Sequence, residues 1–193
     1  MRKVIFESSV SIDGFIEGPN GELDWLVFEE GTCNAETFLF AFDTIFYGRK
    51  AYEKLGPPCV IDPDLPEKER EFILFLHGIR KYVFSRTKKH VEGNGMVIGE
   101  NLEHEVRRIR DEEGENIWFC GGADLLKTFA ALDLIDEYFL TIHPVVLNFG
   151  KSLFAGIEKP LNLRLINRHD LDSGVVILHY RPESRFRNTY END

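Results

Sequence analysis

The order of strand-like and helix-like segments constrains this chain more than any other feature. Short apolar segments alternate with amphipathic ones through the first two thirds, and the last third holds longer strand-like segments joined by turn residues. Alternation of this kind is typical of a largely parallel sheet covered by helices, whereas strands joined by a short turn pair antiparallel. The sequence therefore predicts an α/β fold, with a central mixed, mostly parallel sheet, helices on both faces and a C-terminal antiparallel hairpin.

The bounds of the expected elements follow from the apolar runs and from the Gly and Pro residues between them. Strands are expected at residues 3–10, 44–47, 81–84, 96–98, 116–119, 137–146, 163–171 and 175–180. Helices are expected at residues 34–42, 49–55, 67–76, 102–113 and 121–132. A chain of 193 residues, 43% of them hydrophobic, can bury one substantial core. We expect residues 1–182 to form a single domain and residues 183–193 to be a loose polar tail.

Charge and cysteine content narrow the classes of partner. Acidic side chains outnumber basic ones by 33 to 23, so the formal net charge is −10. Such a field repels polyanions, which argues against nucleic acid and membranes as partners but leaves room for one small anion beside a local cluster of cations. Cys33, Cys59 and Cys120 show no metal-ligand spacing, and no apolar run approaches the roughly 18 residues that span a bilayer. We expect a reduced cytoplasmic protein without a metal ion.

Ligands of open α/β sheets bind beyond the carboxyl ends of strands, and three such ends carry suitable residues. In the first, an apolar strand ends at Gly48, and Arg49 and Lys50 open the next helix, where free N–H groups attract anions. Cations at a helix N-terminus oppose its dipole, so they need another reason to be there. The alternative is that both side chains simply extend into water.

The second strand end is the densest basic patch in this acidic chain. Two hydroxyls, of Ser85 and Thr87, are interleaved with Arg86 and followed by Lys88 and Lys89. Arginine and hydroxyl groups together suit a phosphate monoester, such as the 2′-phosphate that distinguishes NADPH from NADH. The alternative is a solvated basic loop.

The third strand end is the run Gly121-Gly122-Ala123-Asp124, which follows a strand and opens a helix. Paired glycines let the backbone approach a pyrophosphate within hydrogen-bonding distance. The run lacks the GxGxxG pattern, so a tight turn that needs small residues for packing explains it equally well. Taken together, the three strand ends offer contacts for different phosphates of one dinucleotide.

Four blocks of the chain resemble the dihydrofolate reductase superfamily. They are SVSIDGFIEGPNGELDWL at residues 8–25, FDTIFYGRKAYEKLG at 42–56, KYVFSRT at 81–87 and the long block at 117–154, which begins IWFCGGADLL. In particular, they resemble an orphan bacterial branch similar to the C-terminal reductase domain of the riboflavin deaminase-reductase. The zinc-deaminase pattern, His-x-Glu with a later Pro-Cys-x-x-Cys, is absent. The resemblance implies a three-layer dihydrofolate reductase-like fold, NADPH as cofactor and a homodimer.

The resemblance also implies roles for individual segments. Gly48-Arg49-Lys50 and Gly121-Gly122-Ala123 would hold the cofactor phosphates, and Ser85-Arg86 the 2′-phosphate. Residues 11–14 would lie beside the nicotinamide, and residues 18–25 would form a mobile loop over it. The chain departs from the pattern at Ala51, where dihydrofolate reductases usually carry threonine, and at Asn148, where relatives often carry glycine.

The proton donor is harder to assign. Dihydrofolate reductases place one acidic residue on the helix that follows the tryptophan-containing loop, and here Asp24, Glu29, Glu30 and Glu36 compete for that position. Glu30 and Glu36 are the best candidates because they precede and enter the apolar helix, and Asp13 of the nicotinamide segment is a third. Each of them could equally be an ordinary surface carboxylate. We expect His143 to be packed in the core rather than catalytic.

These observations predict transfer of hydride from NADPH to a C=N or C=O carbon of a pterin-like or ribitylaminopyrimidine-like substrate, with the cofactor supplying the chemistry. The alternative is a non-catalytic homodimeric module that binds NADP(H) or a pterin. A further possibility is NADH, or no dinucleotide at all. On that reading Arg86→Ala would leave NADPH affinity unchanged.

Overall fold

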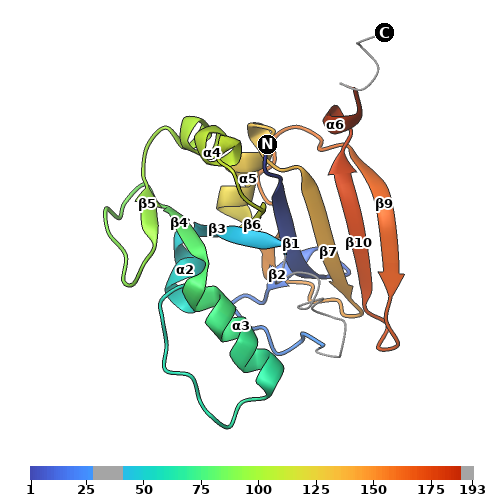
Figure 1. The fold of residues 1–193 in the computed structure, drawn as a ribbon. Coiled ribbons are helices and arrows are strands. Elements are labelled where there is room, and N and C mark those ends of the chain that lie inside the picture. Colours follow the sequence, from blue (N-terminus) through green and yellow to red (C-terminus); the bar gives the residue numbers. More distant parts are fainter. Residues whose placement is uncertain (28–40, 188–193) are drawn as a thin grey trace. The chain divides into compact units, whose positions relative to one another are not determined.

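The computed structural model describes residues 1–27 and 41–187 of the chain (Figure 1). It divides into two compact units, each assembled from distant parts of the sequence. Unit 1 combines Met1–Arg2 with Asn34–Gly122, and unit 2 combines Lys3–Cys33 with Ala123–Asp193. The expectation that residues 1–182 form one domain stays a prediction. Among the described residues, no helix is long and apolar enough to cross a membrane.

Unit 1 is built on parallel strands that run in the order β5-β4-β3-β6. Their bounds are β3 Phe42–Gly48, β4 Arg80–Phe84, β5 Met96–Ile98 and β6 Asn116–Cys120. Three helices flank them, α2 Arg49–Leu55, α3 Glu67–Gly78 and α4 Leu102–Asp111. Ile45 and Phe46 of β3 point to opposite faces of the strand and, like Ile109 of α4, have no exposed surface, so both faces of this central strand are covered.

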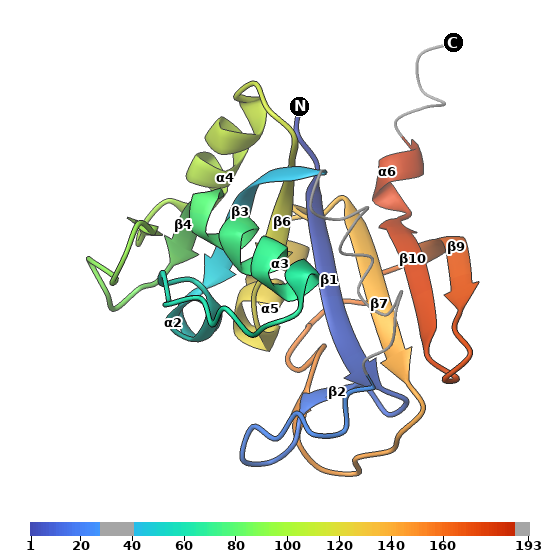
Figure 2. The same ribbon diagram turned by 60° about the horizontal axis from the view of Figure 1, so that its bottom comes forward.

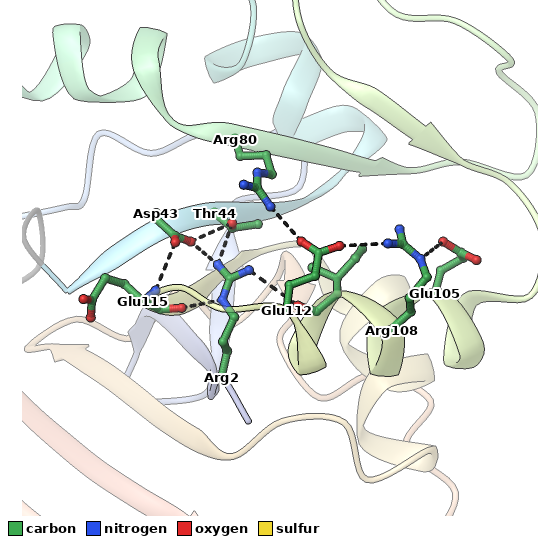
Figure 3. Close-up of polar contacts among 9 residues, drawn as sticks. Arg2, Asp43, Thr44, Arg80, Glu105, Arg108, Glu112 and Glu115 are labelled. Atoms are coloured by element: carbon green, nitrogen blue, oxygen red, sulfur yellow. Dashed lines mark hydrogen bonds and ion pairs between the residues drawn. The ribbon is translucent and has the colours of Figure 1, made fainter.

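The amino end of these strands is held by a buried arginine. Arg2 donates hydrogen bonds to the carboxylate of Asp43, to Thr44 Oγ1 at 2.6 Å and to the carbonyl of Glu115 at 2.6 Å (Figure 3). Asp43 also accepts a hydrogen bond from the backbone N–H of Glu115. The guanidinium therefore links β3 to the segment that leads into β6.

A chain of exposed ion pairs lies beside this arginine (Figure 3). Glu112, just after α4, pairs with Arg80 at the start of β4 and with Arg108, both at 2.8 Å, and Arg108 also pairs with Glu105 at 3.0 Å. Basic residues in the last turn of α4 and acidic ones in its first turn also complement the helix dipole.

Unit 2 contains strands in the order β1-β7-β10-β9 and a small ladder of β2 with β8. Their bounds are β1 Val4–Ser11, β2 Phe15–Glu17, β7 Glu137–His143, β8 Lys151–Ser152, β9 Leu163–Asp170 and β10 Val176–Pro182, with helices α5 Ala123–Ala131 and α6 Ser184–Arg187. β1 and β7 are parallel, whereas β10 is antiparallel to both β7 and β9. Figure 2 shows β2 next to the carboxyl end of β1.

The α/β class, the mostly parallel pairing and the C-terminal antiparallel hairpin are confirmed. β7 ends three residues earlier than expected, at His143, because Pro144 has no N–H for the ladder. α5 begins at Ala123 rather than at Gly121. The two-residue β8 has too short an apolar pattern to be read from sequence. α6 occupies part of the segment expected to be a loose tail.

Candidate functional site

The carboxyl ends of three parallel strands lie side by side in unit 1. In the β3–β4 ladder Gly48 is opposite Phe84, and in the β3–β6 ladder Tyr47 is opposite Cys120. The three sequence motifs that follow these strands therefore start at one edge of the unit. This is the edge at which open α/β sheets bind ligands.

The first motif begins helix α2, whose N-terminus has no side-chain cap and no acidic residue in its first turn. The N–H groups at that end are thus available to an anion. Lys50 is exposed, as expected. Arg49 differs from the expectation, because both oxygens of Glu53 lie 2.7–2.8 Å from its Nη1. This pair neutralises much of the positive charge that the sequence placed here.

The second motif forms a loop, residues 85–90, that we call the basic loop. Ser85 is buried, and its Oγ accepts hydrogen bonds from the backbone N–H groups of Thr87 at 3.4 Å and Lys88 at 3.0 Å. Its hydroxyl proton can still be donated to a ligand. Arg86, Lys88 and Lys89 are exposed, and within the part of the chain that the structure describes they form no ion pair. The buried serine thus holds a turn that presents three cations to solvent.

The third motif connects β6 to α5. Gly121 and Gly122 are partly exposed, and Ala123 is buried as the first residue of the helix. Asp124 is exposed in the first turn of α5, where its negative charge complements the dipole of the helix itself. A carboxylate at this point suits ribose hydroxyl groups better than phosphate oxygens.

A buried tyrosine at the same edge went unnoticed in the sequence. Tyr47 has no exposed surface, and its ring packs edge-on against Tyr52 at a centroid distance of 5.5 Å. Its hydroxyl finds no hydrogen-bond partner among the described residues. Burial, with smaller contributions from Cys120 and Tyr52, raises the pKa of this phenol, so it stays a neutral donor.

In unit 2, the nicotinamide segment expected at residues 11–14 forms a tight turn anchored by Asp13. The carboxylate accepts hydrogen bonds from Ser11 Oγ at 2.7 Å and from the backbone N–H groups of Leu147 and Asn148 at 3.1 and 2.7 Å. The bond from Ser11 and these N–H bonds lower the pKa of Asp13. These are the contacts of an ionised turn anchor, and the catalytic role of Asp13 stays a prediction.

The unusual Asn148 has a structural explanation in this turn. Its φ is +65°, a left-handed conformation that asparagine tolerates better than most other residues with a side chain. This explains why glycine and asparagine can both occupy the position.

The loop expected over the nicotinamide is held by its own contacts. Both carboxylate oxygens of Glu22 accept hydrogen bonds from Asn20, and the backbone carbonyl of Glu22 accepts one from Trp25 Nε1.

One face of the β1–β7 ladder is polar, which distinguishes it from the opposite face. Side chains alternate along a strand, and residues in register on neighbouring strands share a face. Ser9 is in register with Thr141 and Ser11 with His143, and one step earlier Glu7 is in register with Phe139. The opposite face carries Val4, Phe6, Val10, Tyr138 and Leu140, all buried. We call Glu7, Ser9, Ser11, Thr141 and His143 the polar face.

His143 closes the polar face at its carboxyl end. It is buried, its Nδ1 accepts a hydrogen bond from the backbone N–H of Val27 at 3.1 Å, and Trp25 packs edge-on against the ring. Burial lowers its pKa, so the ring is neutral with its proton on Nε2. Nε2 has no partner among the residues that the structure describes. The expectation of a packed histidine is confirmed.

Glu7 is the group on this face that the sequence argument missed. Its side chain is half-buried, and burial raises the pKa of its carboxyl from 4.5 to about 7. The described residues, 1–27 and 41–187, make no hydrogen bond or ion pair to this carboxyl. A glutamate inside an apolar strand was the available signal. The expected candidates Glu30 and Glu36, with Glu29, lie outside the described residues, and Asp24 is exposed.

Among the described residues, no group of three or more His, Cys, Asp and Glu side chains is placed so that it could hold a metal ion.

In sequence, the chain is 40% identical over 179 residues to the uncharacterized protein YyaP of Bacillus subtilis, covering 93% of this chain and 94% of that protein.

Solved structures extend the comparison to the fold. A deaminase/5-amino-6-(5-phosphoribosylamino)uracil reductase from Thermotoga maritima matches 94% of this chain and 56% of its own length, with a TM-score of 0.67 and 17% identity. Dihydrofolate reductase from Enterococcus faecalis, complexed with NADP(H), matches 93% of this chain and 96% of its own length, with a TM-score of 0.62 and 15% identity. These matches confirm the dihydrofolate reductase-like fold.

The family is shown by a match over most of the chain. The family model for the RibD C-terminal domain covers residues 2–177, so it includes the polar face, the basic loop and the other two strand-end motifs. Together with the structural neighbours, this match supports a function of reductase type. The chain belongs to the RibD C-terminal domain family.

Proposed function

We propose that this protein is an NADPH-dependent reductase that transfers hydride to a C=N or C=O carbon of a pterin-like or ribitylaminopyrimidine-like heterocycle. The similarity to a 5-amino-6-(5-phosphoribosylamino)uracil reductase supports the substrate class, and the similarity to a dihydrofolate reductase in complex with NADP(H) supports the cofactor. When bound, the dinucleotide supplies the hydride, and the protein holds and orients the reactants.

The observation that carries this proposal is the basic loop. The protein has a formal net charge of −10, yet Arg86, Lys88 and Lys89 stand on one exposed loop without a carboxylate partner among the described residues. Exposed cations of this kind add little to folding stability. Arginine beside serine and threonine hydroxyls matches a phosphate monoester, the group by which NADPH differs from NADH.

The neighbouring strand ends support the rest of the dinucleotide. The uncapped N-terminus of α2, after Gly48, presents backbone N–H groups to a pyrophosphate. Lys50 adds positive charge there, while Arg49 keeps part of its charge engaged with Glu53. Asp124 in the first turn of α5 suits a ribose hydroxyl. Within unit 1, the basic loop and the N-terminus of α2 would divide the cofactor's phosphates between them.

Isothermal titration with NADPH and, separately, NADH tests the proposal. We expect micromolar binding of NADPH and much weaker binding of NADH. Arg86→Ala should weaken NADPH binding by roughly tenfold or more, because a charge-assisted contact contributes about 1.5–3 kcal/mol, and should leave NADH binding unchanged. Arg107→Ala is the matched control, since Arg107 is also exposed in unit 1 but pairs with Glu103. Equal affinity for both dinucleotides would contradict the assignment of the basic loop.

A non-catalytic module that binds NADP(H) is the second candidate, and the contacts of Asp13 favour it. This carboxylate is engaged as a turn anchor rather than being free to donate a proton. Oxidation of NADPH in the presence of dihydrofolate or 5-amino-6-(5-phosphoribosylamino)uracil distinguishes the two candidates. Steady turnover with either compound excludes the binding module, and tight binding of NADPH without turnover would replace the reductase with it.

A further inference from the structure

Two carboxylates on the same side of the β1–β7 ladder have opposite surroundings. Glu137, in register with Ile5, receives contacts from Lys3 at 2.9 Å, Arg181 at 2.7 Å and His179 at 3.0 Å. Burial alone would raise the pKa of Glu137, but these three partners hold it below its ordinary value. Glu137 is therefore a permanently ionised, structural carboxylate.

Glu7 lies one step further along the same face, in register with Phe139. The ring of Phe139 is stacked against His179 at a centroid distance of 4.1 Å, so the neighbour of Glu7 in register is an aromatic ring rather than a cation. Nothing in the described parts of the chain neutralises the Glu7 carboxylate, and its raised pKa of about 7 follows from that isolation. A carboxyl that is half-buried and unpaired can meet a ligand in its protonated form.

The rest of the polar face consists of hydroxyl groups and one imidazole. Ser9 and Thr141 are hydroxyls in register with one another, and His143 is a neutral ring with a proton on Nε2. On β7 and β10 the remaining charged or titratable groups on this side are Glu137, His179 and Arg181, which contact one another. Glu7 is thus a carboxyl of this face that no cation among the described residues holds ionised.

We propose that Glu7 is the general acid of the reduction, a role that rests on the reductase function proposed above. For a C=N bond, hydride from C4 of the nicotinamide reaches the carbon while the Glu7 carboxyl donates its proton to the nitrogen. The C=N double bond becomes a C–N single bond bearing one new C–H and one new N–H. The dinucleotide leaves as its oxidised form, and water returns a proton to the Glu7 carboxylate.

The test compares the wild type with Glu7→Gln, Glu7→Asp and Glu103→Gln in NADPH oxidation at a series of pH values, with dihydrofolate and 5-amino-6-(5-phosphoribosylamino)uracil as probes. Glu103→Gln is the matched control, because Glu103 is an exposed carboxylate of unit 1 paired with Arg107. The dissociation constant of NADPH and the circular dichroism spectrum are measured for each variant. These two readouts separate a chemical defect from a loss of binding or folding.

We expect wild-type kcat to be level below about pH 7 and to fall roughly tenfold for each further pH unit, since the acid must be protonated. Glu7→Gln should lower kcat by about 100-fold or more and abolish this dependence, with NADPH binding and the spectrum unchanged. Glu7→Asp should restore part of the rate together with a pH-dependent profile, and Glu103→Gln should match the wild type.

The possible failures can be distinguished from one another. If the wild type oxidises NADPH and Glu7→Gln keeps the same rate and pH profile, the acid role is wrong and the reductase function stands. If Glu7→Gln loses NADPH binding or its native spectrum, Glu7 has a structural role instead. If the wild type binds NADPH but turns over neither probe, the proposed function fails first, and the acid role falls with it.

Discussion

In unit 1, the cations at the amino end of the parallel strands have different surroundings from those of the basic loop at the carboxyl end, although Arg49 at that same end is paired with Glu53. At the amino end every labelled arginine in Figure 3 contacts a carboxylate, as Arg2 does with Asp43 and Arg80 with Glu112. At the carboxyl end Arg86, Lys88 and Lys89 have no such partner among the described residues. The first arrangement stabilises the fold and presents no free charge. The second adds nothing to the fold and is available to a ligand.

Charge alone therefore does not identify a binding site in this protein. The distinction lies in whether the surrounding chain has already satisfied the charge. The part-buried pair of Arg2 with Asp43 is costly to break from the Asp43 side, because that would leave the buried guanidinium without its counter-charge. An unpaired exposed cation can be removed at little cost to stability, and its loss is felt when the ligand arrives. Substitutions at the amino end should therefore lower the free energy of unfolding, whereas substitutions in the basic loop should lower the affinity for the ligand.

The largest expected effect comes from Arg2→Ala. The change removes the hydrogen bonds to Asp43, Thr44 and the Glu115 carbonyl, so we expect the free energy of unfolding to fall by about 3 kcal/mol. Urea denaturation measures this, and the NADPH affinity of the folded fraction should stay unchanged. Arg86→Ala serves as the control, with unfolding free energy within about 0.5 kcal/mol of the wild type. A loss below about 1 kcal/mol for Arg2→Ala would break the comparison.

The two carboxylates of unit 2 extend the same contrast to acids. Glu137→Gln removes a carboxylate that three partners hold ionised, so the free energy of unfolding should fall by about 2 kcal/mol at pH 7. Because the pKa of Glu137 is lowered in the folded protein, this stabilisation is present above its ordinary pKa and is lost as the pH falls through the lowered value.

Glu7→Gln should act in the reverse sense. The pKa of Glu7 is raised in the folded protein, so its ionisation costs nothing below about pH 4.5 and reaches its full cost above about pH 7. The glutamine variant should gain about 3 kcal/mol over the wild type above pH 7 and nothing below pH 4.5. Urea titrations across this range measure both variants. If the difference in unfolding free energy between Glu7→Gln and the wild type did not depend on pH, the Glu7 carboxyl would not have the raised pKa of an isolated, buried group.

Lys88→Ala with Lys89→Ala should produce a smaller effect, seen in binding alone. Exposed ammonium groups attract an anion through screened Coulomb interactions, so we expect NADPH affinity to fall a few-fold at low salt and the difference to shrink as salt is added. Titration at two ionic strengths measures this. A loss that is independent of salt would instead indicate that the two substitutions distort the turn held by Ser85.

Tyr47→Phe should have the smallest effect. Its hydroxyl is buried without a partner among the described residues, so removing it leaves no acceptor unsatisfied. We expect a free energy of unfolding within about 0.5 kcal/mol of the wild type, or slightly higher. If NADPH binding weakens while stability does not, the hydroxyl contributes to the ligand site at the carboxyl end of β3.

Much of the architecture was readable from the sequence because it depends on local patterns. The apolar run before Gly48 and the basic run after Phe84 each marked the end of a strand, and the register of β3 with β4 puts those ends side by side. The hairpin turn at residues 172–174 was similarly clear. β8 was missed because a two-residue strand exists only through its partner, β2.

The chemistry of single side chains was harder to predict, because it depends on contacts between distant residues. The pair of Arg49 with Glu53 is the exception, because the two residues are four apart on one helix and the spacing could have indicated it. Glu7 and Glu137 are both glutamates within apolar strands, and their pKa values shift in opposite directions because Lys3 and two side chains of β10 contact Glu137 and not Glu7. The sequence indicated the three strand-end motifs, but it could not rank the acids.

The discontinuous make-up of the units has a consequence for synthesis of the chain. β1 is made before the other described strands, yet Ile5 pairs with Glu137, so β1 has no partner in unit 2 until β7 leaves the ribosome. At ordinary translation rates that interval lasts roughly ten seconds. During it β3, β4 and β6 can already pair with one another. A nascent chain stalled before Glu137 would therefore contain the strands of unit 1 but lack the β1–β7 ladder of unit 2.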